Sequence, residues 1–369
     1  MTMKTRYILM AALLLAASCT NTDYIDVDNV DPILVVNGQI STANTTHTIV
    51  LSSSSLSSVK EVNGANLTVS VNGGAPIKAV EDNTEEEQYG YGLMNGTKYR
   101  FNYNFAAGDN VKLNVADANG AVAEATVNVP KDPIIKKVEV LHEVPHTSSD
   151  SMFDFGGGYD YYGPYTYEAY NSQYPYDSWH ELRITLQDIP SEDSYYRLDV
   201  VIESTITDGE DVQTGYNGIW MDTSSEPVLS SATSSSGGLL DAIAEESNRY
   251  NAFSDNIFKD QEYTLKLFFQ ESQVSYLRNY YYSYDDTEWT YNEDTGAYEP
   301  SPLPDGVTYE TKMHVRLYSI SHDQYIYLKA LDLDDLAIFF SEPISIPSNV
   351  NGGMGFVTID SCKEYTLDY

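Results

Sequence analysis

The sequence predicts an all-β (mainly β) fold: an N-terminal β-sandwich followed by a larger strand-rich β-sandwich with one or two short helices. Short apolar segments with an alternation of two recur along the chain, and Asn-Gly pairs separate several of them. A strand that buries one face needs this alternation, because successive side chains point to opposite faces of a sheet. Asn-Gly accepts a positive φ at both central positions of a hairpin turn, so it favours hairpins between these segments.

The first domain is expected at residues 32–130, where about seven short strands in roughly 100 residues are typical of an immunoglobulin-like β-sandwich. The cysteine pair of antibody domains is absent, and Pro130 and Pro133 mark the end of this region. The expected strands are 33–36, 46–51, 67–71, 99–103, 111–115 and 122–129, and the Asn-Gly turns lie at 63–64, 72–73, 95–96 and 119–120.

The second domain, residues 131–369, is also rich in strand patterns. One short helix is expected at about 239–247 and another from Ser321, where Ser321-His322-Asp323-Gln324 matches a capping box. In that second helix Tyr325, Leu328 and Leu331 recur at helical spacing and are expected to face the core. The clearest strands are 134–141, 179–186, 195–203, 263–269 and 314–319.

The first 18 residues have the pattern of a lipoprotein signal peptide. Lys4 and Arg6 precede an apolar run over residues 7–17, which is too short to span a membrane as a helix. Small residues then precede Cys19, as in a lipobox, although the leucine stands one place earlier than in the strictest form. We expect Cys19 to be lipidated and to anchor an exported protein; the alternative is an ordinary signal peptide with a chance cysteine.

Residues 19–31 are polar and acidic and are expected to form a flexible lipidated tether. The formal net charge of the chain is −35, which argues against nucleic acid or an anionic membrane surface as a partner. A solvated acidic surface explains this charge, and a basic or cationic partner is the alternative. If Cys19 is acylated, Cys362 has no partner for an intrachain disulfide, so a hydrophobic core has to stabilise the fold.

Two tyrosine-rich stretches, 152–176 and 276–304, show no regular pattern and are predicted to be loops. They mix tyrosine with Gly, Asn, Asp and Ser, a composition like that of antibody binding loops. Loops of this length in compact domains are functional or disordered. The alternative is that these tyrosines cover hydrophobic surface on irregular strands. The candidate ligand- or partner-binding residues are Tyr159, Tyr161, Tyr162, Tyr165, Tyr167, Tyr280, Tyr281, Tyr282 and Trp289.

No catalytic residue, metal site or cofactor is predicted. Residues 142–146 read His-Glu-Val-Pro-His and match the zinc-protease pattern, which needs both histidines on one face of a helix. Pro145 is incompatible with the interior of such a helix, and the preceding residues are patterned as a strand. The acidic run at 332–335 lacks the glycine and the final glutamate of a calcium-binding EF-hand loop.

Several segments together resemble one known family. They are residues 31–38, 95–99, 127–130, 195–198, 258–263 and, most strongly, 319–328, 341–343 and 348–356. They are similar to the Bacteroidetes lipoproteins grouped as the domain of unknown function numbered four-two-four-nine. That resemblance implies a surface lipoprotein encoded beside TonB-dependent outer-membrane transporters, and it brings no catalytic residue. Acidic residues after the lipidated cysteine resemble a surface-export signal in such proteins; a plain linker is the alternative.

These observations predict a lipid-anchored outer-membrane protein, exposed at the cell surface, that captures a ligand or assists a TonB-dependent transporter without catalysis. The alternative from another class is an adhesion or assembly subunit built from β-sandwiches. A hydrolase that uses carboxylates or a metal is the third possibility.

Overall fold

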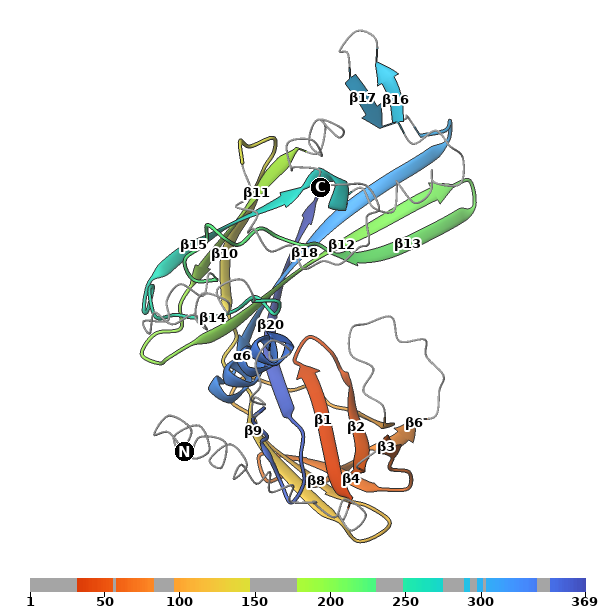
Figure 1. The fold of residues 1–369 in the computed structure, drawn as a ribbon, viewed down its shortest axis with the longest axis vertical. Coiled ribbons are helices and arrows are strands. Elements are labelled where there is room, and N and C mark those ends of the chain that lie inside the picture. Colours follow the sequence, from red (N-terminus) through yellow and green to blue (C-terminus); the bar gives the residue numbers. More distant parts are fainter. Residues whose placement is uncertain are drawn as a thin grey trace, which may run out of the picture.

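The computed structural model describes residues 32–55, 58–82, 96–146, 178–229, 248–274, 289–292, 297–300, 303–336 and 346–369. These residues form the expected mainly β fold, arranged as two sandwiches along the long axis of the molecule (Figure 1). The signal peptide, the tether, the stretch 152–176 and the helix expected at 239–247 lie outside the described residues. No helix among the described residues is long and apolar enough to cross a membrane.

The first sandwich consists of two sheets that enclose one hydrophobic core. The first sheet has the strand order β1-β2-β7-β6, and β3 pairs with the last four residues of β2. Its strands are β1 (Ile33–Ser41), β2 (Thr46–Ser55), β3 (Ser58–Glu61), β6 (Val80–Asp82) and β7 (Thr97–Asn102). The second sheet has the order β19-β9-β8-β4-β5, with β4 (Asn66–Val71), β5 (Ile77–Lys78), β8 (Asn110–Ala116), β9 (Val122–Asn128) and β19 (Val350–Asn351).

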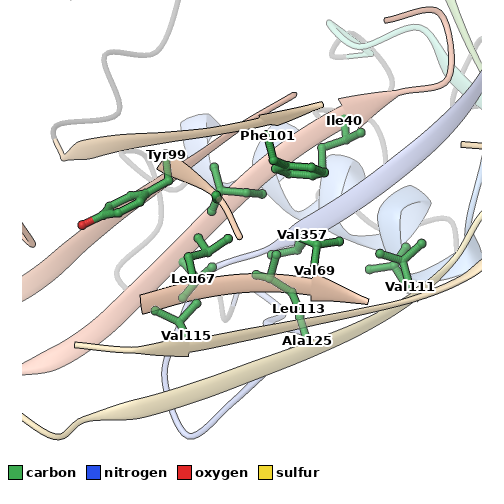
Figure 2. Close-up of a cluster of buried hydrophobic side chains, with 14 of the residues drawn as sticks. Ile40, Leu67, Val69, Tyr99, Phe101, Val111, Leu113, Val115, Ala125 and Val357 are labelled. Carbon is green, nitrogen blue, oxygen red and sulfur yellow. The ribbon is translucent and has the colours of Figure 1, made fainter. Parts of the chain in front are cut away.

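Alternation in the sequence fills this first core. Along β4, Leu67, Val69 and Val71 are buried while the residues between them are not, and Figure 2 shows such side chains from both sheets meeting. The turn after β4 confirms the Asn-Gly prediction, because Asn72 and Gly73 have φ values of 52° and 70°. Regular alternation and the Asn-Gly turn therefore shape the N-terminal strands of this sandwich.

The second sandwich packs a three-stranded sheet, in the order β10-β11-β15, against a second sheet that contains β12 and β18. Buried aliphatic residues from both sheets, such as Ile184 and Leu267 on one side and Val200 and Val315 on the other, form its core. Its strands are β10 (Ile134–Leu141), β11 (Trp179–Gln187), β12 (Tyr195–Asp208), β13 (Asp211–Gly218), β14 (Ala252–Ser254), β15 (Glu262–Gln270), β18 (Val307–Ile320) and β20 (Val357–Asp368).

Strand β20 belongs to both sandwiches. Its first residues pair in parallel with β1, from Gly38 opposite Val357 to Ser41 opposite Asp360. Its later residues pair antiparallel with β18, so one sheet runs through both halves in the order β13-β12-β18-β20-β1-β2-β7-β6. Val357 and Ile359 are part of the first core, as is Val350 of β19. The C-terminal segment therefore helps to build the first sandwich. The domain boundary expected at residue 130 stays a prediction.

Helix α6 (His322–Leu336) packs beside this junction and begins at the predicted N-cap. The Gln324 backbone N–H donates to Ser321 Oγ at 3.1 Å, as a capping box requires. The Gln324 side chain, however, is buried and donates to Asp360 Oδ1 at 2.8 Å. A tertiary partner in β20 therefore takes the side chain that the local motif would use. Tyr327 on the same helix stacks on Phe356, with ring centroids 4.1 Å apart.

The structure corrects the prediction that residues 276–304 lack regular structure. Strands β16 (Trp289–Asn292) and β17 (Ala297–Pro300) pair antiparallel within that stretch. The prediction was wrong because it relied on long alternating apolar segments. A separate two-stranded hairpin with strands of four residues forms without such a segment. The edge strand β13 was also missed. Its two large apolar residues, Val212 and Tyr216, are both exposed, so the segment has no buried apolar face that would mark it.

Gly355 is expected to be intolerant of a side chain. It has a φ of 109°, and a Cβ there would lie 2.2 Å from the carbonyl oxygen of Val36 in β1. Gly355→Ala should lower the free energy of unfolding by about 3 kcal/mol, measured by urea denaturation, because strain and a backbone clash add. Gly218→Ala in β13 meets nothing within 4 Å and should change it by less than about 0.5 kcal/mol. Equal effects of the two substitutions would contradict this account.

Candidate binding site

A cavity of about 750 Å³ opens at the end of the second sandwich that points away from the first. Strand β1 starts in the first sandwich, and the parallel strand β20 runs on to Asp368 beside the cavity (Figure 1). The cavity and the first described residues therefore lie at opposite ends of the molecule. The lining residues are His142, Glu271, Val274, Tyr309, Glu310, Thr311, Lys312, Asp368 and Tyr369.

The cavity exists because the strands of the large sheet end at different points. Asp368, the last residue of β20, pairs with Lys312, whereas β18 continues past it to Val307. The inward-facing side chains of β18 also change along this direction, from the apolar Met313 to Thr311 and Tyr309. The apolar core therefore gives way to a polar lining where the strand pairing stops.

Two histidines, a glutamate and a tyrosine form a chain of contacts at this cavity. His142 Nδ1 lies 3.1 Å from His180 Nδ1, and His180 Nε2 lies 2.9 Å from Glu271 Oε2. The Tyr369 hydroxyl donates to the same Glu271 oxygen at 2.8 Å. Burial and this hydrogen bond raise the pKa of Tyr369, so it stays a neutral donor. His180 is buried and His142 is exposed, so this series of side-chain contacts leads from the interior to solvent.

The position of one proton follows from these contacts. A carboxylate only accepts hydrogen bonds, so the neighbouring Nε2 of His180 carries the proton. In the neutral imidazole, Nδ1 of His180 is then a bare acceptor, and Nδ1 of His142 has to donate to it. Glu271 thereby sets the tautomer of both rings.

The lining is acidic and carries aromatic groups. Three carboxylates, from Glu271, Glu310 and Asp368, face one ammonium group, from Lys312. The Tyr309 hydroxyl lies 3.0 Å from the Val274 carbonyl oxygen, which holds the short helix α4 (Glu271–Val274) against β18. Such a cavity favours a cationic or hydrogen-bond-donating ligand over an anion.

The two histidines of the His-Glu-Val-Pro-His segment have separate partners. The segment is not helical, and Glu143 has a φ of 53°. His142 contacts His180, whereas His146 stacks on Phe268 at 3.8 Å and lies 2.8 Å from Asp222. Within the described part of the chain, no three His, Cys, Asp or Glu side chains form a group that could hold a metal ion. The segment does not have the geometry of a zinc-protease site.

The described residues that line this cavity include none of the binding residues predicted from sequence. Trp289 begins β16, and its binding role stays a prediction. The remaining candidates and the lipidation residue lie outside the described residues: Cys19, Tyr159, Tyr161, Tyr162, Tyr165, Tyr167, Tyr280, Tyr281 and Tyr282. No sequence pattern marks His180, Glu271 and Tyr369 as a site, because they come from distant segments and no spacing links them.

Comparison with known proteins identifies the family. The model of the domain of unknown function DUF4249 matches residues 21–366, so the chain belongs to that family. A search among curated proteins finds no match. A solved structure from work on the promiscuous specificity of carbohydrate-binding modules of the β-sandwich superfamily is 11% identical, with a TM-score of 0.18. The match covers 66% of this chain and 92% of that one, and a TM-score this low carries no argument about the ligand.

The contact between His146 and Asp222 predicts a pH-dependent contribution to stability. Burial alone would raise the pKa of Asp222, but hydrogen bonds from Ser224 and His146 outweigh it and hold the pKa below its usual value. The stabilisation is therefore present above the usual carboxylate pKa and is lost as the pH falls through the lower value of the folded state.

Asp222→Asn should lower the free energy of unfolding by about 2 kcal/mol at pH 7, and the difference from wild type should shrink at pH 3. Urea denaturation at both pH values measures it. The surface variant Glu139→Gln, whose partner Lys137 is exposed, should change the free energy by less than about 0.5 kcal/mol. A difference for Asp222→Asn that is the same at both pH values would contradict the assignment.

Proposed function

We propose that this chain is a lipid-anchored outer-membrane protein, exposed at the cell surface, that captures a ligand or serves as an accessory subunit of a TonB-dependent transporter. The observation that supports this function best is the cavity at the free end of the double sandwich. Its volume of about 750 Å³ suits a small ligand or a protruding part of a partner. The proposal includes no catalytic step.

The position of the cavity fits an anchor at Cys19. The expected tether, residues 19–31, leads directly into β1, which starts in the first sandwich. Strand β20 runs parallel to β1 and ends beside the cavity, so an anchored molecule would present the cavity away from the membrane. The buried contacts at the junction favour a fixed orientation of the two sandwiches, which would hold the cavity at a distance from the membrane. The transporter itself is proposed from the resemblance of the sequence to lipoproteins encoded beside such transporters.

The anchor can be tested by membrane fractionation of cells that produce Cys19→Ser. Each CH₂ group of an acyl chain contributes about 0.8 kcal/mol to membrane binding. The variant lacks the acyl chains and should therefore leave the membrane fraction. Cys362→Ser is the matched control and should stay with the membrane. Burial raises the pKa of the Cys362 thiol to about 11, so this side chain is an unreactive thiol. Membrane association that survives Cys19→Ser would contradict the lipid anchor.

The partner can be tested by a detergent pull-down of the tagged native lipoprotein, followed by mass spectrometry. A TonB-dependent transporter should be recovered in a stoichiometric amount. Glu310→Lys reverses a charge at the cavity rim and should lower that recovery about fivefold, since such a charge contributes up to about 1 kcal/mol. Glu61→Lys reverses an exposed charge in the first sandwich and should leave recovery unchanged.

Two results would count against this proposal in different ways. Recovery of the lipoprotein alone from gently solubilised membranes would reject the transporter role. Recovery of the transporter in equal amounts with Glu310→Lys and Glu61→Lys would reject the cavity as the contact surface.

A further inference from the structure

We propose that His142, which lines the cavity, and its buried neighbour His180 bind a divalent transition-metal ion, such as Zn²⁺, Ni²⁺ or Cu²⁺, through their Nδ1 atoms. Imidazole nitrogens are preferred ligands of these ions. The inference names the ligand class of the proposed binding site, and it rests on the proposed function only for the role of the ion as captured cargo. Metal binding itself can be measured without any partner.

The distance between the two ring nitrogens fits two ligands of one ion. The Nδ1 atoms are 3.1 Å apart, and a nitrogen ligand lies about 2.0–2.1 Å from zinc. An ion at that distance from both atoms would have a ligand–metal–ligand angle of roughly 100°. This value lies between the right angle of an octahedral pair and the wider angle of a tetrahedral pair. The rings meet edge to face, with centroids 5.0 Å apart, so one ring does not stack on the other and cover Nδ1.

The surroundings of His180 match those of a metal-binding histidine. Such a histidine almost always gives its other ring N–H to a carboxylate or carbonyl, which fixes the tautomer and makes the ligating nitrogen more basic. Glu271 lies 2.9 Å from Nε2 of His180 and so leaves Nδ1 as the ligating atom. The Tyr369 hydroxyl holds the same Glu271 oxygen. These supporting contacts exist before any ion is present.

Binding needs a change of tautomer in His142. His142 now carries its proton on Nδ1, and it would move that proton to Nε2 through solvent as Nδ1 takes the ion. Because His142 is exposed, water can exchange that proton directly. The ring stays neutral throughout, and no oxidant or reductant is needed.

Charge and openness favour an exchangeable ion over a structural one. Glu310 and Asp368 line the same cavity and attract a cation, while Lys312 opposes them. The described residues supply two histidine ligands and no third His, Cys, Asp or Glu in a ligating group. Structural zinc sites instead close all four positions with protein ligands. The open positions here can hold water or the donor atoms of a bound chelator, as capture of a metal cargo requires.

The test is isothermal titration calorimetry of the full chain in detergent with Zn²⁺ alone and, separately, with Ni²⁺ alone. Wild type should bind one ion, and His142→Ala should lose at least tenfold in affinity. The substituted residue is exposed, so the fold is expected to persist, and circular dichroism checks this. His322→Ala, which removes another exposed histidine on α6, should bind as wild type does.

Glu271→Gln separates a supporting contact from a ligand. Loss of the carboxylate should weaken binding about 10- to 100-fold without abolishing it. With Cu²⁺, electron paramagnetic resonance should show coupling to two imidazole nitrogens in wild type and to one in His142→Ala. Absence of binding by wild type, or equal affinity of wild type and His142→Ala, would overturn the proposal.

One further outcome would place the ion elsewhere. His314 lies 3.0 Å from Glu203 and 3.1 Å from Glu364 on the outer face of the large sheet, and it is the competing location. Binding that is lost in His314→Ala and kept in His142→Ala would overturn the assignment to the cavity. The metal-binding measurements do not depend on the pull-down of the transporter. Failure of metal binding and failure of the transporter role therefore remain distinguishable.

Discussion

The double pairing of β20 is the constraint on which the rest of the structure depends. One continuous strand hydrogen-bonds to β1 of the first sandwich and then to β18 of the second. Its side chains enter both cores, with Ile359 in the first and Leu367 packed against the second. A shared strand cannot bend freely without breaking backbone hydrogen bonds on both sides. The two sandwiches are therefore coupled more closely than two domains joined by a linker would be.

Buried polar contacts reinforce this coupling. Asp360 is buried in β20, where Gln324 of α6 donates to it and Arg197 of β12 lies 3.6 Å away. Burial raises the pKa of Asp360, because desolvation disfavours the charged carboxylate. The Arg197 guanidinium also lies over the Tyr318 ring at 4.0 Å. These directional contacts join helix α6 to strands β12, β18 and β20 at one point, so they define the relative orientation of the elements.

The cavity depends on the same strand. Its lining comes from the end of β20, the overhanging part of β18, helix α4 and the residue after β10. His180 and Glu271 come into contact because β11 and β15 pair, with Trp179 opposite Gln270 at that end of the sheet. The first sandwich separates the cavity from the first described residues. The proposed binding site and the first described residues are thus separated by the length of the shared sheet.

The sequence by itself determined the long core strands, the turn at Asn72-Gly73 and the start of α6 at Ser321, because these depend on local periodicity and on turn or capping residues. The tertiary structure alone decided that residues 350–359 complete the first sandwich, since parallel pairing with β1 joins segments more than 300 residues apart. It also decided the site: His142, His180, Glu271 and Tyr369 meet through strand pairing, and no spacing in the sequence encodes that meeting. Local patterns record which face of a strand is buried, whereas a site is defined by which strands become neighbours.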